Sequence, residues 1–208
     1  MKIAKPSKMQ ALVDKKLGSY REIYGLHELK GIEKYNKYSH MFVMGSTCIF
    51  VLLFLILDYF DVLELSNTFL VSGSSQIMIV ATITFAVFIM SGIMAPMHEI
   101  IHYLLFPRKQ GEVYLIFRLP KLIAIFFDGF LTKKRHLIVQ LAPFIVINIL
   151  ILVFNNFITD RAITILLIQL NFLTSGSDIF MFFDVLFNAP SKSYIYAGYY
   201  TTDDVGII

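Results

Sequence analysis

The amino-acid sequence predicts an all-α membrane protein with four transmembrane helices and a short cytoplasmic β-hairpin or interfacial segment. Hydrophobic residues make up 57% of the 208 residues and charged residues only 16%. This balance is typical of a polytopic membrane protein and not of a soluble domain. Four apolar runs are also each long enough, with their flanks, to cross a bilayer. We expect these spans at about 41–57, 77–106, 136–157 and 161–187.

The segment before the first span, residues 1–40, is polar and basic, with nine Lys or Arg residues against four acidic residues. We expect a short amphipathic helix or loop on the cytoplasmic membrane surface, where anionic headgroups attract its cations. Because the segment leads directly into a span, nucleic acid is not an expected partner. His27-Glu28 resembles the start of a metal-binding motif, but Gly31 stands where a second His would be needed.

The expected second, third and fourth spans contain residues that interrupt a regular apolar helix. Pro96 and Pro143 each remove one backbone hydrogen bond, and Pro107 ends the second span. The fourth span holds more polar side chains than lipid contact tolerates, Asn171 and Asp178 among them. Such polar faces would let water reach the membrane interior.

Residues 108–135 form the longest polar connection. Within it, residues 113–127 contain two runs of β-branched and aromatic residues that flank Pro120-Lys121, which predicts a hairpin. A fifth span is the alternative. We reject it because Arg118 would then lie near Lys121 at mid-membrane without an evident partner.

Charge asymmetry orients the spans. Residues 1–40 and 108–135 together hold sixteen of the eighteen Lys and Arg residues. By the positive-inside rule, both termini and the long loop are cytoplasmic. The sequence therefore predicts a multi-pass protein of the cell membrane, with residues 188–208 as a cytoplasmic strand or loop.

The residues with the clearest chemistry are His98-Glu99-Ile100-Ile101-His102, near the end of the second expected span. On a helix, His98 and His102 lie one turn apart on one face, so both imidazoles can bind one cation. Glu99 projects from another direction, where a general base can take a proton from water. Ionisable groups inside a span are costly, and a bound Zn²⁺ would offset that cost. The alternative is a pair of histidines hydrogen-bonded to neighbouring helices, with Glu99 as a buried relay.

Asp178 is the expected third ligand. It lies about nine residues from the cytoplasmic end of its span, roughly 13 Å, and His98 lies about eight residues from the end of its own, roughly 12 Å. In a four-span topology both would lie at one depth. Four other side chains are weaker candidates for this role, namely Asp184, Glu112, Asp128 and His136.

Asn171 is the expected donor to an oxyanion. It lies seven residues before Asp178 and shares its helix face with Thr174 and Ser175. Its amide could stabilise the charge that forms when water attacks a peptide carbonyl. An interhelical hydrogen bond is the equally supported alternative.

Over about residues 40–208 the chain resembles the family of putative zincin peptidases, which are small multi-span membrane proteins. The residues that carry this resemblance are His98-Glu99-x-x-His102, Ala142-Pro143 and Asn171-x-x-x-Ser175-Gly176-x-Asp178. The chain is also distantly similar to the site-2 family of intramembrane metalloproteases, but it lacks that family's Leu-Asp-Gly sequence. Its Asn-to-Asp spacing of seven is also one residue shorter.

The resemblance implies a zinc-dependent intramembrane metallopeptidase in which His98, His102 and Asp178 bind Zn²⁺. Glu99 would be the base and Asn171 the oxyanion donor. The expected partners are the lipid bilayer and a membrane-protein or peptide substrate, and the sequence indicates no oligomeric state. The alternatives are a non-catalytic metal-binding transport protein and a pseudoenzyme scaffold in the membrane.

Overall fold

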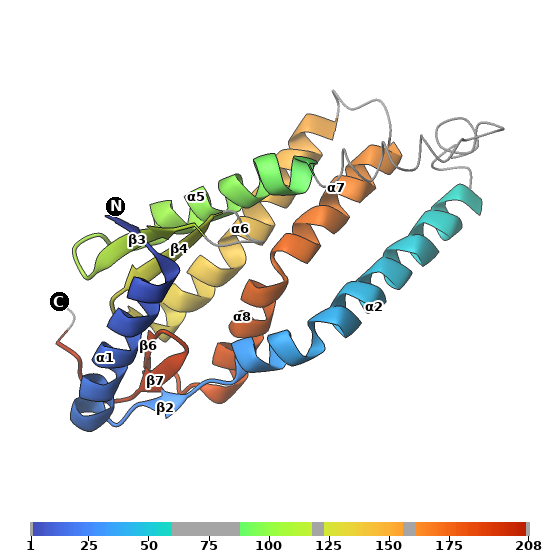
Figure 1. The fold of residues 1–208 in the computed structure, drawn as a ribbon. Coiled ribbons are helices and arrows are strands. Elements are labelled where there is room, and N and C mark those ends of the chain that lie inside the picture. The colour runs from blue at the N-terminus through green and yellow to red at the C-terminus, as the bar shows by residue number, and fades with distance from the viewer. Residues whose placement is uncertain (1, 60–87, 118–122, 156–160, 207–208) are drawn as a thin grey trace.

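The computed structural model describes residues 2–59, 88–117, 123–155 and 161–206 of the chain (Figure 1). Its helices are α1 (Pro6–Tyr24), α2 (Gly31–Tyr59), a π-helical turn (Met90–Met94), α5 (Ala95–Leu105), α6 (Lys133–Phe154), α7 (Arg161–Thr174) and α8 (Gly176–Asn188). Its strands are β1 (Lys2–Ala4), β2 (His27–Glu28), β3 (Glu112–Ile116), β4 (Ala124–Asp128), β5 (Leu131–Thr132), β6 (Tyr194–Tyr196) and β7 (Tyr199–Thr201).

The predicted all-α fold with four transmembrane helices is wrong. The described residues form seven strands in two sheets as well as the helices. One described helix, α6, is long and apolar enough to cross a membrane, and the bent pair α7–α8 would be a second if it counts as one span. The apolar composition indicated the helices correctly, but short strands that pair with distant residues leave no period in the sequence.

Breaks within the expected spans account for much of this difference. The expected fourth span, 161–187, is divided after Thr174, and its two parts are bent by 57°. Of the expected second span, residues 77–87 lie outside the described part. The remainder includes a π-helical turn and continues as α5, with Pro96 in the first turn of α5, directly after the π-helical turn.

The first sheet contains the expected hairpin. Strands β3 and β4 pair antiparallel, with Val113 opposite Phe127 and Leu115 opposite Ile125. Strand β1 adds in parallel on the other side of β3, so β4 lies at one edge of the sheet. Val113 and Phe127 are buried against Phe106, which places this sheet beside the C-terminal end of α5.

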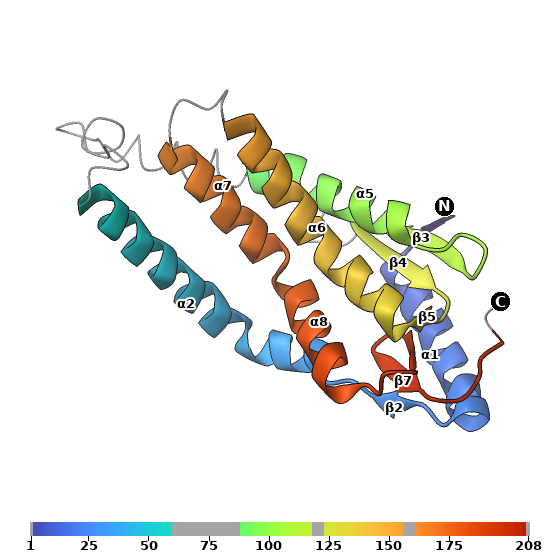
Figure 2. The same ribbon diagram turned by 180° about the vertical axis from the view of Figure 1, so that it is seen from behind.

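The second sheet has the strand order β2-β7-β6-β5, with all pairs antiparallel. It joins residues 27–28 to residues 199–200, so both ends of the chain lie at the same end of the molecule (Figure 1). The predicted peripheral strand in the tail is therefore a hairpin. Seen from behind, α2, α6 and α7 run away from the two sheets (Figure 2).

Helix α6 packs against both α5 and α8. Its first turn also carries cations that bond the last carbonyls of those helices. Lys133 donates to the carbonyls of Leu186 and Ala189 at the end of α8, at 2.9 and 2.6 Å, and Arg135 donates to that of Leu105 at the end of α5. These contacts satisfy carbonyls that have no intrahelical partner and place positive charge at the negative ends of both helix dipoles.

Asp184 connects α8 to the start of α2. Its carboxylate, only 5% exposed, accepts from the backbone N–H of Gly31 at 2.7 Å and from the Asn188 amide at 2.7 Å, with Lys34 at 3.5 Å. The approach is close enough that a Cβ at residue 31 would lie 2.8 Å from that of Asp184. A carboxylate from another helix thus takes the place of a local N-cap for α2.

We expect Asp184→Ala to lower the free energy of unfolding by about 2–3 kcal/mol, because it leaves the buried Gly31 N–H and the Lys34 ammonium without their acceptor. Denaturant unfolding of the purified protein, followed by circular dichroism, measures the change. Asp203→Ala, at an exposed position, is the matched control. Equal stability of the two variants would contradict this role for Asp184.

Candidate metal centre

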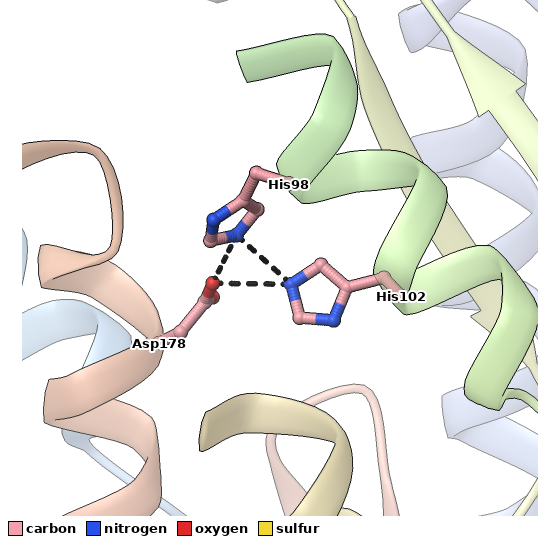
Figure 3. A group of neighbouring side chains, drawn as sticks. All are labelled: His98, His102 and Asp178. Carbon is pink, nitrogen blue, oxygen red and sulfur yellow. Dashed lines mark hydrogen bonds and ion pairs between the residues drawn. The ribbon is translucent and has the colours of Figure 1, made fainter. Parts of the chain in front are cut away.

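Two histidines on α5 form one side of a compact polar cluster. His98 and His102 are one helical turn apart, and both are buried, with 5% and 7% of their surface exposed. Their Nε2 atoms lie 3.0 Å apart, which brings both imidazoles to a single point (Figure 3). The two imidazole rings therefore converge, as their i, i+4 spacing predicts.

Asp178 reaches the same point from α8 (Figure 3). Its Oδ2 lies 2.6 Å from the Nε2 of His98 and 3.1 Å from the Nε2 of His102. The chain can deliver this carboxylate because α7 ends at Thr174 and α8 starts at Gly176 in a new direction, with Asp178 in its first turn. The positive end of the α8 dipole favours an anion there.

The three ligand atoms lie close to the spacing of a zinc site. Four ligands at about 2.0–2.1 Å from Zn²⁺ in tetrahedral geometry lie roughly 3.3 Å apart. The three separations here, 2.6, 3.0 and 3.1 Å, are shorter, so small side-chain movements would open the cluster to an ion. Two imidazole nitrogens and one carboxylate oxygen are also ligands that catalytic zinc sites use, with a fourth position left for water or substrate. His98, His102 and Asp178 therefore fit a zinc ion as its three protein ligands.

Ser175, at the break between α7 and α8, supports this cluster. Its hydroxyl lies 3.5 Å from the Nδ1 of His98, and its side chain is fully buried. A partner on Nδ1 fixes the orientation of the ring and directs Nε2 toward the metal. The sequence analysis placed Ser175 on the face of Asn171 but gave it no contact with His98. The break itself, which the sequence does not reveal, creates that contact.

Glu99 points to the β-sheet and not to the ligand cluster. Its Oε2 accepts a hydrogen bond of 2.8 Å from the backbone N–H of Ile125 on β4. The hydrogen bond holds the carboxylate at β4, and Glu99 follows His98 directly in the chain without belonging to the group of ligand atoms. This arrangement suits a general base, which must lie next to the metal without binding it.

The other carboxylates considered as ligands lie elsewhere. Asp184 binds the start of α2, and Glu112 is half exposed and paired with Lys2. Asp128 is buried between Lys16, at 2.6 Å, and the hydroxyl of Tyr196, at 3.0 Å. Burial, followed by the neighbouring Asp128 carboxylate, raises the pKa of Tyr196 above its ordinary range. Among the described residues, none of these three acids joins the metal cluster.

Asn171 is fully buried on α7, and its amide donates to the carbonyl of Phe144 at 3.0 Å. This is the interhelical hydrogen bond that the sequence analysis left open as an alternative. The carbonyl of Asn171 in turn accepts from the N–H of Ser175, across the break that precedes α8. Its predicted role as an oxyanion donor stays a prediction.

A cavity of about 760 Å³ adjoins the cluster. Its walls come from α1, β4, α6 and α8, and they include Ile125, Asp178 and two further polar side chains of α6, His136 and Gln140. The volume falls in the range of sites that hold a small molecule or a short peptide segment. His27, which starts the incomplete second motif, is exposed on β2 and stacks on Tyr200.

Comparison with known proteins gives one match. A family model described as "Putative zincin peptidase" matches residues 91–194, which is half of the chain and includes His98, Glu99, His102 and Asp178. Neither the curated proteins nor the solved structures gave a match.

We expect Asp178→Ala to lose bound zinc, because two imidazoles alone leave the ion without the third protein ligand that a catalytic site requires. In metal analysis of the purified protein, the zinc content should fall from one per chain to far below one. Asp184→Ala, a change to the nearest other acid on the same helix, should keep its zinc. The assignment of Asp178 is overturned if both variants retain the metal equally.

Proposed function

Because the chain belongs to the family of putative zincin peptidases, we propose that it is a zinc-dependent intramembrane metallopeptidase. It would hydrolyse peptide bonds of membrane-protein substrates. The observation that carries the proposal is the meeting of three ligand atoms from α5 and α8. Glu99, the residue after His98, is held in place by a hydrogen bond from β4.

The residues of this chain divide the work of peptide hydrolysis. His98, His102 and Asp178 would hold Zn²⁺, which polarises a peptide carbonyl and makes water more acidic. Glu99 takes a proton from the attacking water while the oxygen of that water bonds to the carbonyl carbon. When the carbon–nitrogen bond breaks, Glu99 returns that proton to the leaving amine. One acid and one amine result, and Glu99 is again a carboxylate.

The edge of β4 favours an extended substrate. Ile125 contributes both a wall of the cavity and the donor to Glu99, so β4 passes directly beside the base. In an antiparallel pair, alternate peptide groups face away from the partner strand, and those of Ile125 and Phe127 face away from β3. A substrate segment that aligned with this edge would be unwound from a helix, which exposes its peptide bonds to attack.

Exposed apolar side chains support contact with lipid. They cover the outer faces of α2 and α6 and recur on α8. Large ones with more than half of their surface exposed include Met41, Met44, Ile49, Ile149, Leu152, Val153, Phe154 and Phe187. An apolar surface of this extent is costly in water, whereas hydrocarbon accommodates it at no such cost. We therefore place these faces in the membrane and the sheets at its cytoplasmic surface.

We expect Glu99→Gln to abolish cleavage and leave zinc at one per chain, because the amide keeps the shape of the side chain but accepts no proton. Fluorescein-labelled casein in detergent is a general peptidase substrate for this measurement. Glu22→Gln, an exposed change on α1, is the control. If Glu99→Gln is as active as the control, Glu99 is not the base. A wild-type protein that holds zinc but cleaves nothing favours the transport or scaffold alternative.

Fluorescence tests the membrane contact, because the chain contains no Trp. We expect a Trp placed at Ile149, on the exposed face of α6, to be quenched by lipids brominated on their acyl chains. A Trp at Ile23 on α1, also exposed, should not be quenched. Equal quenching at both sites, or at neither, contradicts the proposed orientation.

A further inference from the structure

His136 is a buried polar side chain in the cavity wall to which neither metal binding nor proton transfer has assigned a role. It lies near the start of α6, with 8% of its surface exposed, and it lines the cavity together with Asp178. Its ring nitrogens are not among the ligand atoms that lie within 4.8 Å of one another, so it is not a fourth member of the metal cluster. It nevertheless shares the cavity wall with Asp178 and lies on the helix that packs against both α5 and α8.

The position of His136 follows from the packing of α6. This helix contacts both α5, which carries the paired histidines, and α8, which carries Asp178. A side chain on the inner face of α6 therefore lies against the seam where the ligands meet. Arg135 and Lys133 bond the ends of α5 and α8, so the first turn of α6 is held in place on both sides.

Gln140, one turn further along α6, fixes the histidine. Its Nε2 lies 3.3 Å from the Nε2 of His136. When the amide N–H of Gln140 donates to this nitrogen, the proton of the neutral ring resides on Nδ1. Within the described chain, the Oε1 of Gln140 is buried and has no hydrogen-bond partner. A buried acceptor without a partner calls for an explanation, and a group that binds in the cavity would provide one.

We propose that His136, positioned by Gln140, donates a hydrogen bond from Nδ1 to the oxygen of the scissile carbonyl as that oxygen gains negative charge. The inference rests on the proposed peptidase function and adds a catalytic residue to it. As water adds to the carbonyl carbon, the electron pair of the C=O bond moves to oxygen, and His136 stabilises that oxygen without transferring its proton. When the carbon–nitrogen bond breaks, the pair returns and the hydrogen bond weakens.

The structure favours His136 over Asn171 for this role. The amide of Asn171 already donates to Phe144, and the side chain is not part of the cavity wall. His136 does line the cavity, and the wall of that cavity also includes Asp178, whose carboxylate would hold the metal. A donor inside a water-poor site is worth about 10²–10³-fold in kcat, because it is aligned before charge develops.

The test compares His136→Ala, His136→Asn and a control, His40→Ala, which removes an exposed histidine of α2. On fluorescein-labelled casein, His136→Ala should lower kcat about 10²-fold or more with KM within about threefold, because the contact forms only as charge develops. Zinc should stay at one per chain. His136→Asn, which keeps an N–H near the position of Nδ1, should recover part of the lost kcat.

A second measurement does not need turnover. N-phosphoryl-Leu-Phe carries a tetrahedral anion like the one that forms during hydrolysis, and its binding to the zinc-loaded protein is measured by calorimetry. His136→Ala should weaken this binding about 10²-fold, while His40→Ala should leave it unchanged.

Each result has one meaning. Loss of zinc in His136→Ala, an unchanged kcat, or a rise in KM alone overturns the role of His136 and leaves the peptidase proposal standing. Continued cleavage by Glu99→Gln overturns the peptidase proposal instead. If the wild-type protein cleaves no casein, the N-phosphoryl-Leu-Phe measurement decides. Equal binding by wild type and His136→Ala, or no binding by either, then overturns the inference.

Discussion

The break between α7 and α8 is the constraint on which the rest of the site depends. A continuous helix through residue 175 would carry Asp178 along the axis of α7, whereas the 57° bend turns the first turn of α8 toward α5. The same break buries Ser175 against His98 and frees Asn171 to bind α6. One irregularity in the backbone therefore supplies a ligand, supports a second ligand and fixes the neighbouring helix.

Helix α6 holds the two ligand-bearing helices together from their ends. Lys133 and Arg135 are separated by a single residue, yet they bond the C-termini of two different helices. In the sequence these cations belong to a basic cluster that indicates a cytoplasmic membrane edge. In the structure two of them also donate to specific backbone carbonyls. Hydrogen bonding within the protein therefore explains their position without any attraction to lipid headgroups. The distribution of Lys and Arg predicts how a chain is oriented in a membrane, but it does not predict which groups accept hydrogen bonds from these cations.

Part of this structure follows from the sequence, and the reason differs from element to element. The i, i+4 spacing of His98 and His102 fixes their convergence on any helix, and the composition of residues 113–127 correctly predicts the hairpin. The meeting with Asp178 was expected from depth in a four-span topology, a premise that the fold corrects. The small strands β1, β2 and β5 were not predictable, because two or three residues that pair with distant partners produce no pattern. The contact of Glu99 was not predictable either, since a backbone donor has no signature in the side-chain sequence.

The contact between Glu99 and the backbone of Ile125 determines which substitutions residue 125 tolerates. The group that orients the carboxylate of Glu99 is the peptide nitrogen of Ile125, not its side chain. Most replacements at residue 125 preserve the donor, so drift at this position would leave the orientation of the base intact. Only proline deletes the donor while the chain length stays the same. A residue whose side chain makes no such contact can thus still position a neighbouring carboxylate, and a scan of ordinary substitutions would pass over it.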